Sequence, residues 1–167
     1  LVAVSLCRNI EGADVKFVPM WDGDKRSIEA AARHLGPDII SDRIDPGVLM
    51  KARLDCKYVL TLPGNDFPSG MRHDLLSGRL VLMPRPFWEC IWFFGLEPGV
   101  HYIPLRADLA DLEERLQWCK DNDGQCREIA EAGRAFALQH FDPALEHAVQ
   151  SRMVARIAQQ TLPVDCY

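Results

Sequence analysis

The chain lacks the marks of a membrane, metal or redox protein. None of its apolar runs approaches the roughly 20 residues that a membrane-spanning helix requires. Its cysteines form no C-x-x-C pair, and no two histidines and a carboxylate share the spacing of metal ligands. We therefore expect no zinc ribbon, no redox dithiol and no metal site.

Positive charge is also scarce. The sequence has 19 Lys and Arg residues against 24 Asp and Glu residues, which gives a net charge of −5. A protein that binds a nucleic acid polymer needs a basic face to neutralise the phosphates. The charge balance therefore argues against a nucleic acid polymer as the main partner, but it allows one small phosphorylated ligand held by a few residues.

Two further absences narrow the class of protein. No G-x-G-x-x-G motif follows the strand predicted at residues 57–62, which argues against a dinucleotide-binding oxidoreductase. Internal repeats and low-complexity segments are also missing. The six cysteines are scattered, as expected for small core residues in a reducing compartment, although disulfides stay open if the protein is secreted.

Length and composition indicate one globular domain. The sequence has 167 residues, of which 48% are hydrophobic and 26% are charged. It begins at Leu1 rather than methionine, and residues 1–7 are already apolar like part of a helix or strand. We therefore expect a single domain over residues 1–167 that is part of a longer, two-domain protein.

Short apolar runs alternate with segments of helical spacing. The runs rich in β-formers predict strands at residues 13–19, 57–62, 79–83 and 100–105. Helices are predicted at residues 27–34, 47–54, 71–77, 108–121, 125–140 and 143–160. This alternation predicts an α/β fold with a Rossmann-like, mainly parallel sheet, and with C-terminal helices over about residues 108–160.

The predicted C-terminal helices have one apolar face each. Leu109, Leu112, Leu116 and Cys119 lie at i, i+3, i+7 and i+10 along the first of them. Residues 122–124 are expected to break the helix before the next one begins. That second helix carries its apolar face on Ile129, Phe136 and Leu138.

The segment 57–82 has the order strand, glycine-containing loop, helix, strand. Such a turn gathers free backbone N–H groups and the positive end of a helix dipole, which favours phosphate. Gly64 and Gly70 would let the backbone approach a ligand, Ser69 could cap the helix or donate to a phosphate, and Arg72 could hold a diphosphate. On these grounds alone, a capped helix with a surface arginine is the favoured explanation of the segment, because many such turns bind nothing.

Several ordered motifs resemble those of CAP10-like (family 90) glycosyltransferases. The similarity runs from about residue 57 to residue 141, half of the chain. It is carried by KYVL at residue 57, GND at residue 64, SG at residue 69, LVLMP at residue 80, EPGVHYIPL at residue 97, DLEE at residue 111 and REIA at residue 127.

The resemblance implies a fold and an activity. It implies the C-terminal half of a two-domain GT-B glycosyltransferase, which takes glucose or xylose from a UDP-sugar to an acceptor hydroxyl on a glycan, a lipopolysaccharide or capsule, or a protein. The general base would lie in the N-terminal half, and no metal or other cofactor is expected. The donor-binding residues that it implies are Gly64, Asn65, Asp66, Ser69, Gly70, Arg72 and Glu89.

The resemblance also sets expectations for location and marks some departures. A bacterial member would act in the cytoplasm, including the periphery of the inner membrane, and a eukaryotic one in the secretory lumen. Arg72 stands where many bacterial members have lysine, which keeps the positive charge. His73 and Asp74 replace an aromatic and apolar pair, and Gly78 with Arg79 replaces Asn-Ser. These differences bear on the choice of donor.

Two other functions stay open at this stage. A noncatalytic module that binds a nucleotide or a carbohydrate could have the same fold, and it would bind UDP without turnover. A structural interaction domain would instead have a closed pocket.

Overall fold

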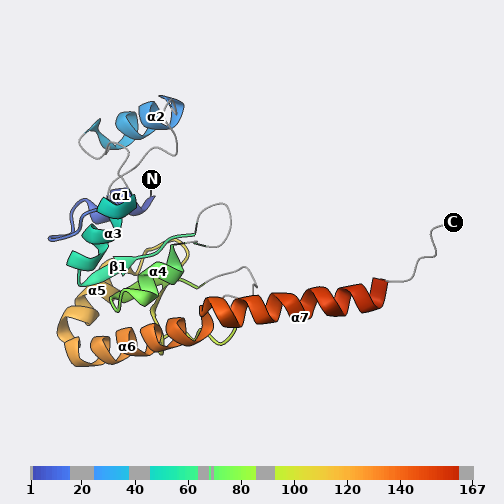
Figure 1. The fold of residues 1–167 in the computed structure, drawn as a ribbon. Helices are drawn as coiled ribbons and strands as arrows, with labels where there is room; N and C mark the ends of the chain where they lie inside the picture. The colour runs from blue at the N-terminus through green and yellow to red at the C-terminus, as the bar shows by residue number, and fades with distance from the viewer. Residues whose placement is uncertain are drawn as a thin grey trace.

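The computed structural model describes residues 2–15, 25–37, 46–63, 68, 70–85 and 93–161. Along the chain these residues form seven helices and three strands (Figure 1). The first elements are α1 (Val2–Cys7), α2 (Lys25–Leu35), α3 (Pro46–Asp55), β1 (Tyr58–Leu60) and α4 (Met71–Leu76). The others are β2 (Leu80–Pro84), β3 (Ile103–Leu105), α5 (Leu112–Asp121), α6 (Asp123–His140) and α7 (Pro143–Thr161).

The sheet has three parallel strands in the order β1-β2-β3. Tyr58 pairs with Leu80, and Leu82 pairs with Ile103, which fixes the register across the sheet. All five residues of β2 are buried. A parallel strand covered on both faces reads as a continuous apolar run, and LVLMP is such a run. The predicted α/β fold with a parallel sheet is therefore confirmed.

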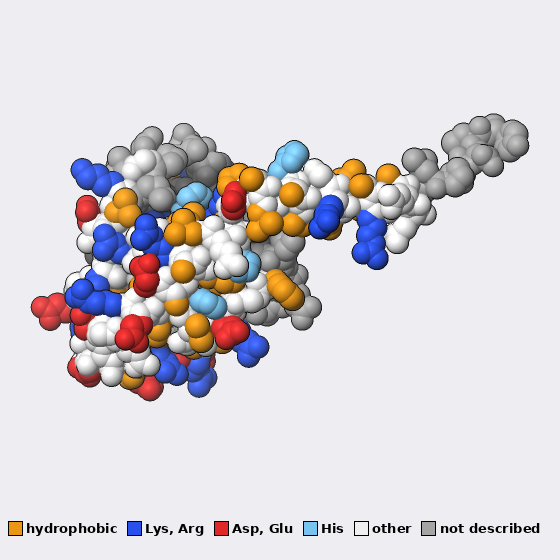
Figure 2. Space-filling view, turned by 60° about the horizontal axis from the view of Figure 1, so that its bottom comes forward, with side chains coloured by type: hydrophobic (Ala, Val, Ile, Leu, Met, Phe, Trp, Pro, Cys, Tyr) orange, Lys and Arg blue, Asp and Glu red, His pale blue; other side chains and the backbone are white. Residues whose placement is uncertain are grey.

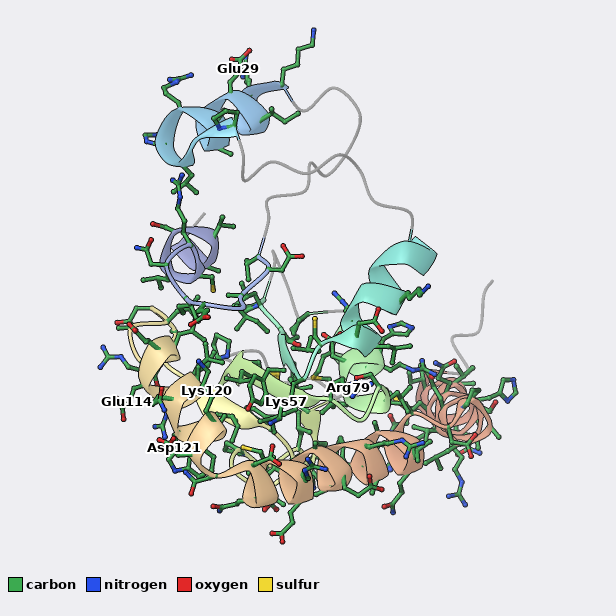
Figure 3. The ribbon with its side chains drawn as sticks, turned by 90° about the vertical axis from the view of Figure 1, so that its left-hand side faces the viewer. Glu29, Lys57, Arg79, Glu114, Lys120 and Asp121 are labelled. Atoms are coloured by element: carbon green, nitrogen blue, oxygen red, sulfur yellow. The ribbon has the colours of Figure 1, made fainter. Side chains whose placement is uncertain are left out.

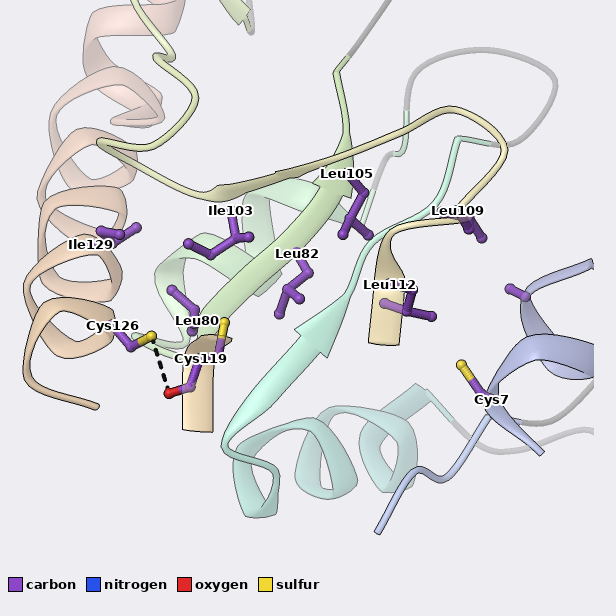
Figure 4. Packing of buried hydrophobic residues seen from close by; sticks show 11 residues of the cluster. Cys7, Leu80, Leu82, Ile103, Leu105, Leu109, Leu112, Cys119, Cys126 and Ile129 are labelled. Carbon is purple, nitrogen blue, oxygen red and sulfur yellow. Dashed lines mark hydrogen bonds between the residues drawn. The ribbon is translucent and has the colours of Figure 1, made fainter. Parts of the chain in front are cut away.

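One face of the sheet packs on α5, on α1 and on the first half of α6. The side chains on this face come from alternate positions of β2 and β3, because successive side chains of a strand point to opposite faces (Figure 4). The strand residues of this cluster are Leu80, Leu82, Ile103 and Leu105. Its helical residues include Cys7, Leu112, Cys119, Cys126 and Ile129, and Leu109 joins it from the turn before α5.

The other face packs on α4 and on the second half of α6. Val81 and Met83 of β2 contact Met71 and Leu75 of α4, and Phe136 lies in the same cluster. In this way α6 contributes to both faces of the core and lies along the lower side of the fold in Figure 1.

Several predicted elements differ from the observed ones. Residues 13–15 of the strand predicted at 13–19 have no regular structure, and its remaining residues lie outside the described part. The helix predicted from residue 108 begins at Leu112, because Leu109 has a φ of 59° and the Asp108 carboxylate accepts a bond from the N–H of Ala110. That turn still buries Leu109 beside Leu112, as the spacing predicted.

The helix break between α5 and α6 is shorter than predicted. Asn122 alone separates the helices, and residues 123 and 124 already belong to α6. The prediction that the apolar face of α6 is buried is confirmed for Ile129 and Phe136. It is wrong for Leu138, which is 58% exposed. Ala137, which is fully buried, takes the place expected for Leu138.

The strand predicted at residues 100–105 is also shorter than expected. β3 covers Ile103–Leu105, while residues 100 and 101 form a turn and Tyr102 makes an isolated bridge to Pro98. That turn is held by a bond from the N–H of Gly99 to the carbonyl of Tyr102. The motif EPGVHYIPL thus contains this turn and then β3.

α7 extends away from the sheet (Figure 1), and apolar side chains are visible along it in Figure 2. Exposed apolar residues of this helix include Met153, Val154 and Ile157. Arginines such as Arg152 and Arg156 interrupt them. Of the helices that the structure describes, none has the length and apolar character to cross a membrane.

Candidate functional site

The three strands end at one edge of the sheet, called here the carboxyl edge. Open parallel α/β sheets bind their ligands outside this edge. Thr61 follows β1, Arg85 follows β2 and Arg106 follows β3. Arg106 binds the Asp108 carboxylate through two bonds of 3.0 and 2.8 Å, and Arg85 is exposed. The described residues at the carboxyl edge are therefore polar and basic.

A buried carboxylate is bound to Thr61, the residue that directly follows β1. Asp74 of α4 is 2% exposed, and both of its oxygens are bound. Nη1 of Arg53 lies 2.7 Å from Oδ1, and the Thr61 hydroxyl donates to Oδ2 over 2.7 Å. Burial raises the pKa of the Asp74 carboxyl, while the Thr61 bond and the charge of Arg53 act in the opposite direction.

Arg53 reaches this carboxylate from the last turn of α3. Its side chain is 30% exposed, whereas that of Asp74 is 1% exposed, so one end of the ion pair meets solvent. The pair joins α3 to α4 across the carboxyl end of β1. The bond to Asp74 restricts the orientations that this planar guanidinium can take.

Gly70 leaves the space that this guanidinium occupies. Gly70 is the N-cap residue of α4 with a φ of −70°, so no unusual backbone angle requires glycine there. A Cβ at residue 70 would lie 3.2 Å from Nη1 and 3.5 Å from Nη2 of Arg53. The close neighbour of the Gly70 backbone is therefore the Arg53 side chain.

Arg72 connects α4 to the junction of α6 and α7. Its Nη2 donates to the carbonyl of Phe141 over 3.0 Å, and its Nη1 lies 3.8 Å from a carboxylate oxygen of Glu146. The guanidinium also lies over the Phe141 ring, 5.7 Å from its centroid. The predicted contact of Arg72 with a diphosphate stays a prediction beside this observed role in the fold.

The other predicted donor residues lie outside the described part of the chain. They are Gly64, Asn65, Asp66, Ser69 and Glu89. Their proposed roles stay predictions. Of the predicted site residues that the structure describes, Gly70 lies beside the Arg53–Asp74 pair, whereas the Arg72 side chain contacts Phe141 and Glu146.

The sequence interpretation missed Arg53, Thr61 and Asp74 as a group. One signal was present, since Asp74 takes an apolar position in an otherwise typical motif. A charged side chain at a core position needs a partner of opposite charge. The partner lies 21 residues away in the sequence, and no periodic pattern connects the two residues.

His101, in the turn before β3, has a structural role. Its Nδ1 accepts the backbone N–H of Glu97 over 2.9 Å, which stabilises the turn. Its ring centroid lies 4.9 Å from that of Phe136. Burial lowers the pKa of the His101 imidazole, with the Glu97 charge acting against it, so the neutral form is favoured.

A pocket of about 690 Å³ lies at the opposite edge, where the strands begin. Lys57 and Arg79, labelled in Figure 3, line it together with Asp123 and Arg127 of α6. Asp123 forms an ion pair with Lys57 and accepts a bond of 2.9 Å from Arg127. The pKa of Lys57 is raised by its bond to Asp123. The cations Lys57 and Arg127 thus have an internal partner.

Metal ligands do not gather in the described residues. Within these ranges no three side chains of the types His, Cys, Asp and Glu come together as a metal site would require. The expectation that the protein works without a metal stays a prediction.

The parallel sheet and its covering helices define a Rossmann-like α/β domain. A sucrose-phosphate synthase from Thermosynechococcus elongatus has this fold, with a TM-score of 0.70, 14% identity, and coverage of 95% of this chain and 42% of that one. Anabaena Alr3699/HepE in complex with UDP-glucose has it with a TM-score of 0.64 and 16% identity, over 93% of this chain and 44% of that one. The fold is of the GT-B type.

The chain belongs to glycosyl transferase family 90, whose sequence profile matches residues 46–147. It is 56% identical to protein O-glucosyltransferase 2 of Danio rerio over 85 residues, which are 51% of this chain and 17% of that protein. It is 43% identical to the O-glucosyltransferase LpsA of Dichelobacter nodosus over 68 residues, 40% of this chain and 21% of that protein. The predicted family is confirmed, and the chain spans about a fifth of the length of these relatives.

Proposed function

We propose that the chain is the donor-binding part of a glycosyltransferase that moves a glucose- or xylose-type sugar from a UDP-sugar to an acceptor hydroxyl. The observation that carries the proposal is the family match over residues 46–147, which includes the whole sheet and the described residues of its carboxyl edge. Ligands of parallel α/β sheets bind at that edge. The donor would therefore lie beside Thr61 and the segment that follows it.

The chemistry of this part would be electrostatic. When the sugar leaves, negative charge grows on the UDP diphosphate, and preoriented N–H donors stabilise it. We assign this task to the segment with Gly64, Asn65, Ser69 and Gly70, and to Arg72. Asp66 would line the sugar pocket.

Other groups would complete the reaction. Glu89 would accept hydrogen bonds from ribose or sugar hydroxyls. A general base must take the proton of the acceptor hydroxyl, and we expect that base outside these 167 residues. No metal is part of the proposal, so chelation should leave the activity unchanged.

The identity of the donor has indirect support. Both named relatives are O-glucosyltransferases, and the HepE structure of the same fold holds UDP-glucose. One of these relatives is named for a protein acceptor. The acceptor of this chain is accordingly proposed only as a hydroxyl of a glycan, a lipopolysaccharide or capsule, or a protein.

Calorimetry with matched nucleotides tests the donor assignment. UDP, UDP-glucose and UDP-xylose should bind the chain, whereas ADP and uridine should bind more weakly, and EDTA should not change the UDP affinity. Equal binding of ADP and UDP, or no binding of either, would contradict the proposal. A transfer assay with the full-length polypeptide then follows UDP release from both sugars.

A noncatalytic binding module is the second candidate. It would have the same fold and the same family match over residues 46–147, with binding of the nucleotide sugar but no transfer. UDP-sugar binding without UDP release by the full-length polypeptide, tested over glycan and protein acceptors, would support the module. Release of UDP with formation of a glycosylated product would exclude it.

A further inference from the structure

We propose that Arg53 is an additional donor-binding residue, with Asp74 as the residue that positions it. The inference rests on the proposed function, because it assigns Arg53 to the diphosphate of the same UDP-sugar. The motifs that carry the family resemblance begin after Arg53, so no motif assigned it a role. Its position follows from the contacts of four residues at the carboxyl end of β1.

The Arg53 guanidinium lies at the carboxyl end of β1. Thr61 directly follows β1, and its hydroxyl lies within 2.7 Å of the carboxylate that holds Arg53. Gly70 lies beside the same guanidinium at the beginning of α4, where an added Cβ would be 3.2 Å from Nη1 of Arg53. Arg53 therefore lies between the end of the strand and the start of the helix, at the edge where parallel sheets bind ligands.

The Arg53 side chain is restrained by its bond to Asp74. A free arginine on a surface must lose rotamer freedom when it binds a ligand, and this loss weakens binding. The Asp74 carboxylate, buried and bound on its other oxygen by Thr61, holds one N–H of Arg53 in place. Four of the five guanidinium N–H groups are not needed for that bond. With 30% of its side chain exposed, Arg53 is also accessible from solvent.

Arg72 and Arg106 have partners of a different kind from that of Arg53. Arg72 donates to the Phe141 carbonyl and faces Glu146, on the side of α4 that meets α6 and α7. Arg106 forms two bonds to Asp108. Arg53 differs because its partner is buried while the arginine itself is half-buried. A diphosphate is the ligand that suits such a planar, two-pronged donor.

The charge of Asp74 limits what Arg53 contributes. A carboxylate 2.7 Å from the guanidinium offsets part of its attraction for an anion. The benefit of the pair therefore lies in oriented hydrogen-bond donors more than in net charge. It follows that lysine, which keeps the charge but has no planar fork, should replace Arg53 poorly.

Calorimetry of UDP and uridine on a variant set tests the inference. The variants are Arg53→Ala, Arg53→Lys and Asp74→Asn, and the matched control is Lys51→Ala, which removes a positive charge from an exposed position of the same helix. Arg53→Ala should weaken UDP binding on the order of tenfold or more, with uridine binding unchanged. Arg53→Lys should recover only part of the loss, and Lys51→Ala should bind UDP like the wild type.

Asp74→Asn separates positioning from stability. It should lower the ratio of UDP to uridine affinity by less than Arg53→Ala does, because the guanidinium stays but loses its charged anchor. A purely structural pair would lower the melting temperature of both variants and leave the ratio unchanged, and this outcome overturns the inference. If Arg53→Ala does not fold, the ratio measured for Arg53→Lys decides, because equal ratios in that variant and in the wild type also overturn it. Failure of UDP to bind the wild type would refute the proposed function and the inference together, while wild-type binding with an unaffected ratio refutes the inference alone.

Discussion

Gly133 of α6 lies against the backbone carbonyl of His101, so closely that a Cβ at residue 133 would overlap the carbonyl oxygen. The side chain of Leu75 closes the same space, 3.1 Å from where that Cβ would be. Because α6 also packs on β2 and α4, it cannot move away without opening the core. The glycine therefore sets how closely α6 approaches the turn before β3.

Gly133→Ala should lower the free energy of unfolding by about 1–3 kcal/mol, the usual cost of overfilling a packed contact. Urea denaturation measures the change. The control is Gly124→Ala in the same helix, where nothing lies within 4 Å of the added Cβ. That variant should be unchanged or slightly stabilised, since alanine favours helix. Equal behaviour of the two variants would show that the contact with His101 is not a constraint.

Leu112→Ala should create a cavity between α5 and the sheet. Leu112 is 3% exposed and lies in the cluster with Leu82 and Leu105. The expected loss is roughly 2–4 kcal/mol of unfolding free energy by chemical denaturation. Leu138→Ala, at a position 58% exposed, serves as the control and should change stability by less than about 0.5 kcal/mol. A loss of that small size for Leu112→Ala would mean that α5 does not cover the core.

The Asp74 carboxyl should give stability an unusual pH dependence. Burial raises its pKa above the ordinary value of 3.8. A group whose folded pKa is raised binds its proton more tightly when folded, so its contribution is full below about 3.8 and is lost as pH rises through the folded pKa. The unfolding free energy of the wild type relative to Asp74→Asn should therefore fall as pH increases from about 3.8 upward, when both are followed by urea denaturation.

Asp108 provides a control, because its pKa is shifted in the opposite direction to that of Asp74. Its bonds to Arg106 lower the pKa of this exposed carboxyl to about 2. Its contribution is thus present above the ordinary value and lost as pH falls towards 2, so the wild type relative to Asp108→Asn should show the opposite slope, reduced by salt. If the Asp74 difference also grows with pH, Arg53 and Thr61 outweigh burial and the assigned direction is wrong.

The described cysteines should differ strongly in reactivity. Cys56 is exposed, whereas Cys119 and Cys126 are buried, and Cys126 Sγ donates to the carbonyl of Cys119 over 3.6 Å (Figure 4). Burial raises the pKa of Cys119 to about 12, so almost no thiolate forms at pH 8. Alkylation of the native protein at pH 8, resolved by mass spectrometry, should modify Cys56 before Cys119 and Cys126. Labelling of Cys119 at the rate of Cys56 would contradict its burial.

Arg72 is expected to matter for stability as well as for the donor. Arg72→Ala loses the bond to the Phe141 carbonyl, which should cost about 0.5–1.5 kcal/mol of unfolding free energy. If the proposed diphosphate contact also holds, UDP affinity falls while uridine affinity does not, and Arg72→Lys recovers part of the loss. Equal changes for UDP and uridine would leave Arg72 with the structural role alone.

Local patterns were enough for most of the secondary structure. The strands at β1 and β2 and the helices α4, α6 and α7 lie within one or two residues of the predicted ranges, because apolar period and turn residues act over a few neighbours. The start of α5 was missed because Asp108 and Leu109 form a turn that the apolar spacing alone does not distinguish from a helix. Leu138 was misplaced because the rotation of α6 is set by its neighbours.

The sequence by itself determined the family and the α/β class. Both depend on the order of motifs and of predicted strands and helices along the chain, which needs no knowledge of the packing. It also marked Asp74 as an unusual residue, without a partner to explain it. Only the tertiary structure decided that Arg53 and Thr61 bind this carboxylate and that Gly70 lies beside them. It also decided that Arg72 contacts Phe141 and Glu146. The physical reason is distance along the chain. A charge buried in one element must be balanced by a group from another, and which group arrives there depends on how α3, β1 and α4 pack together.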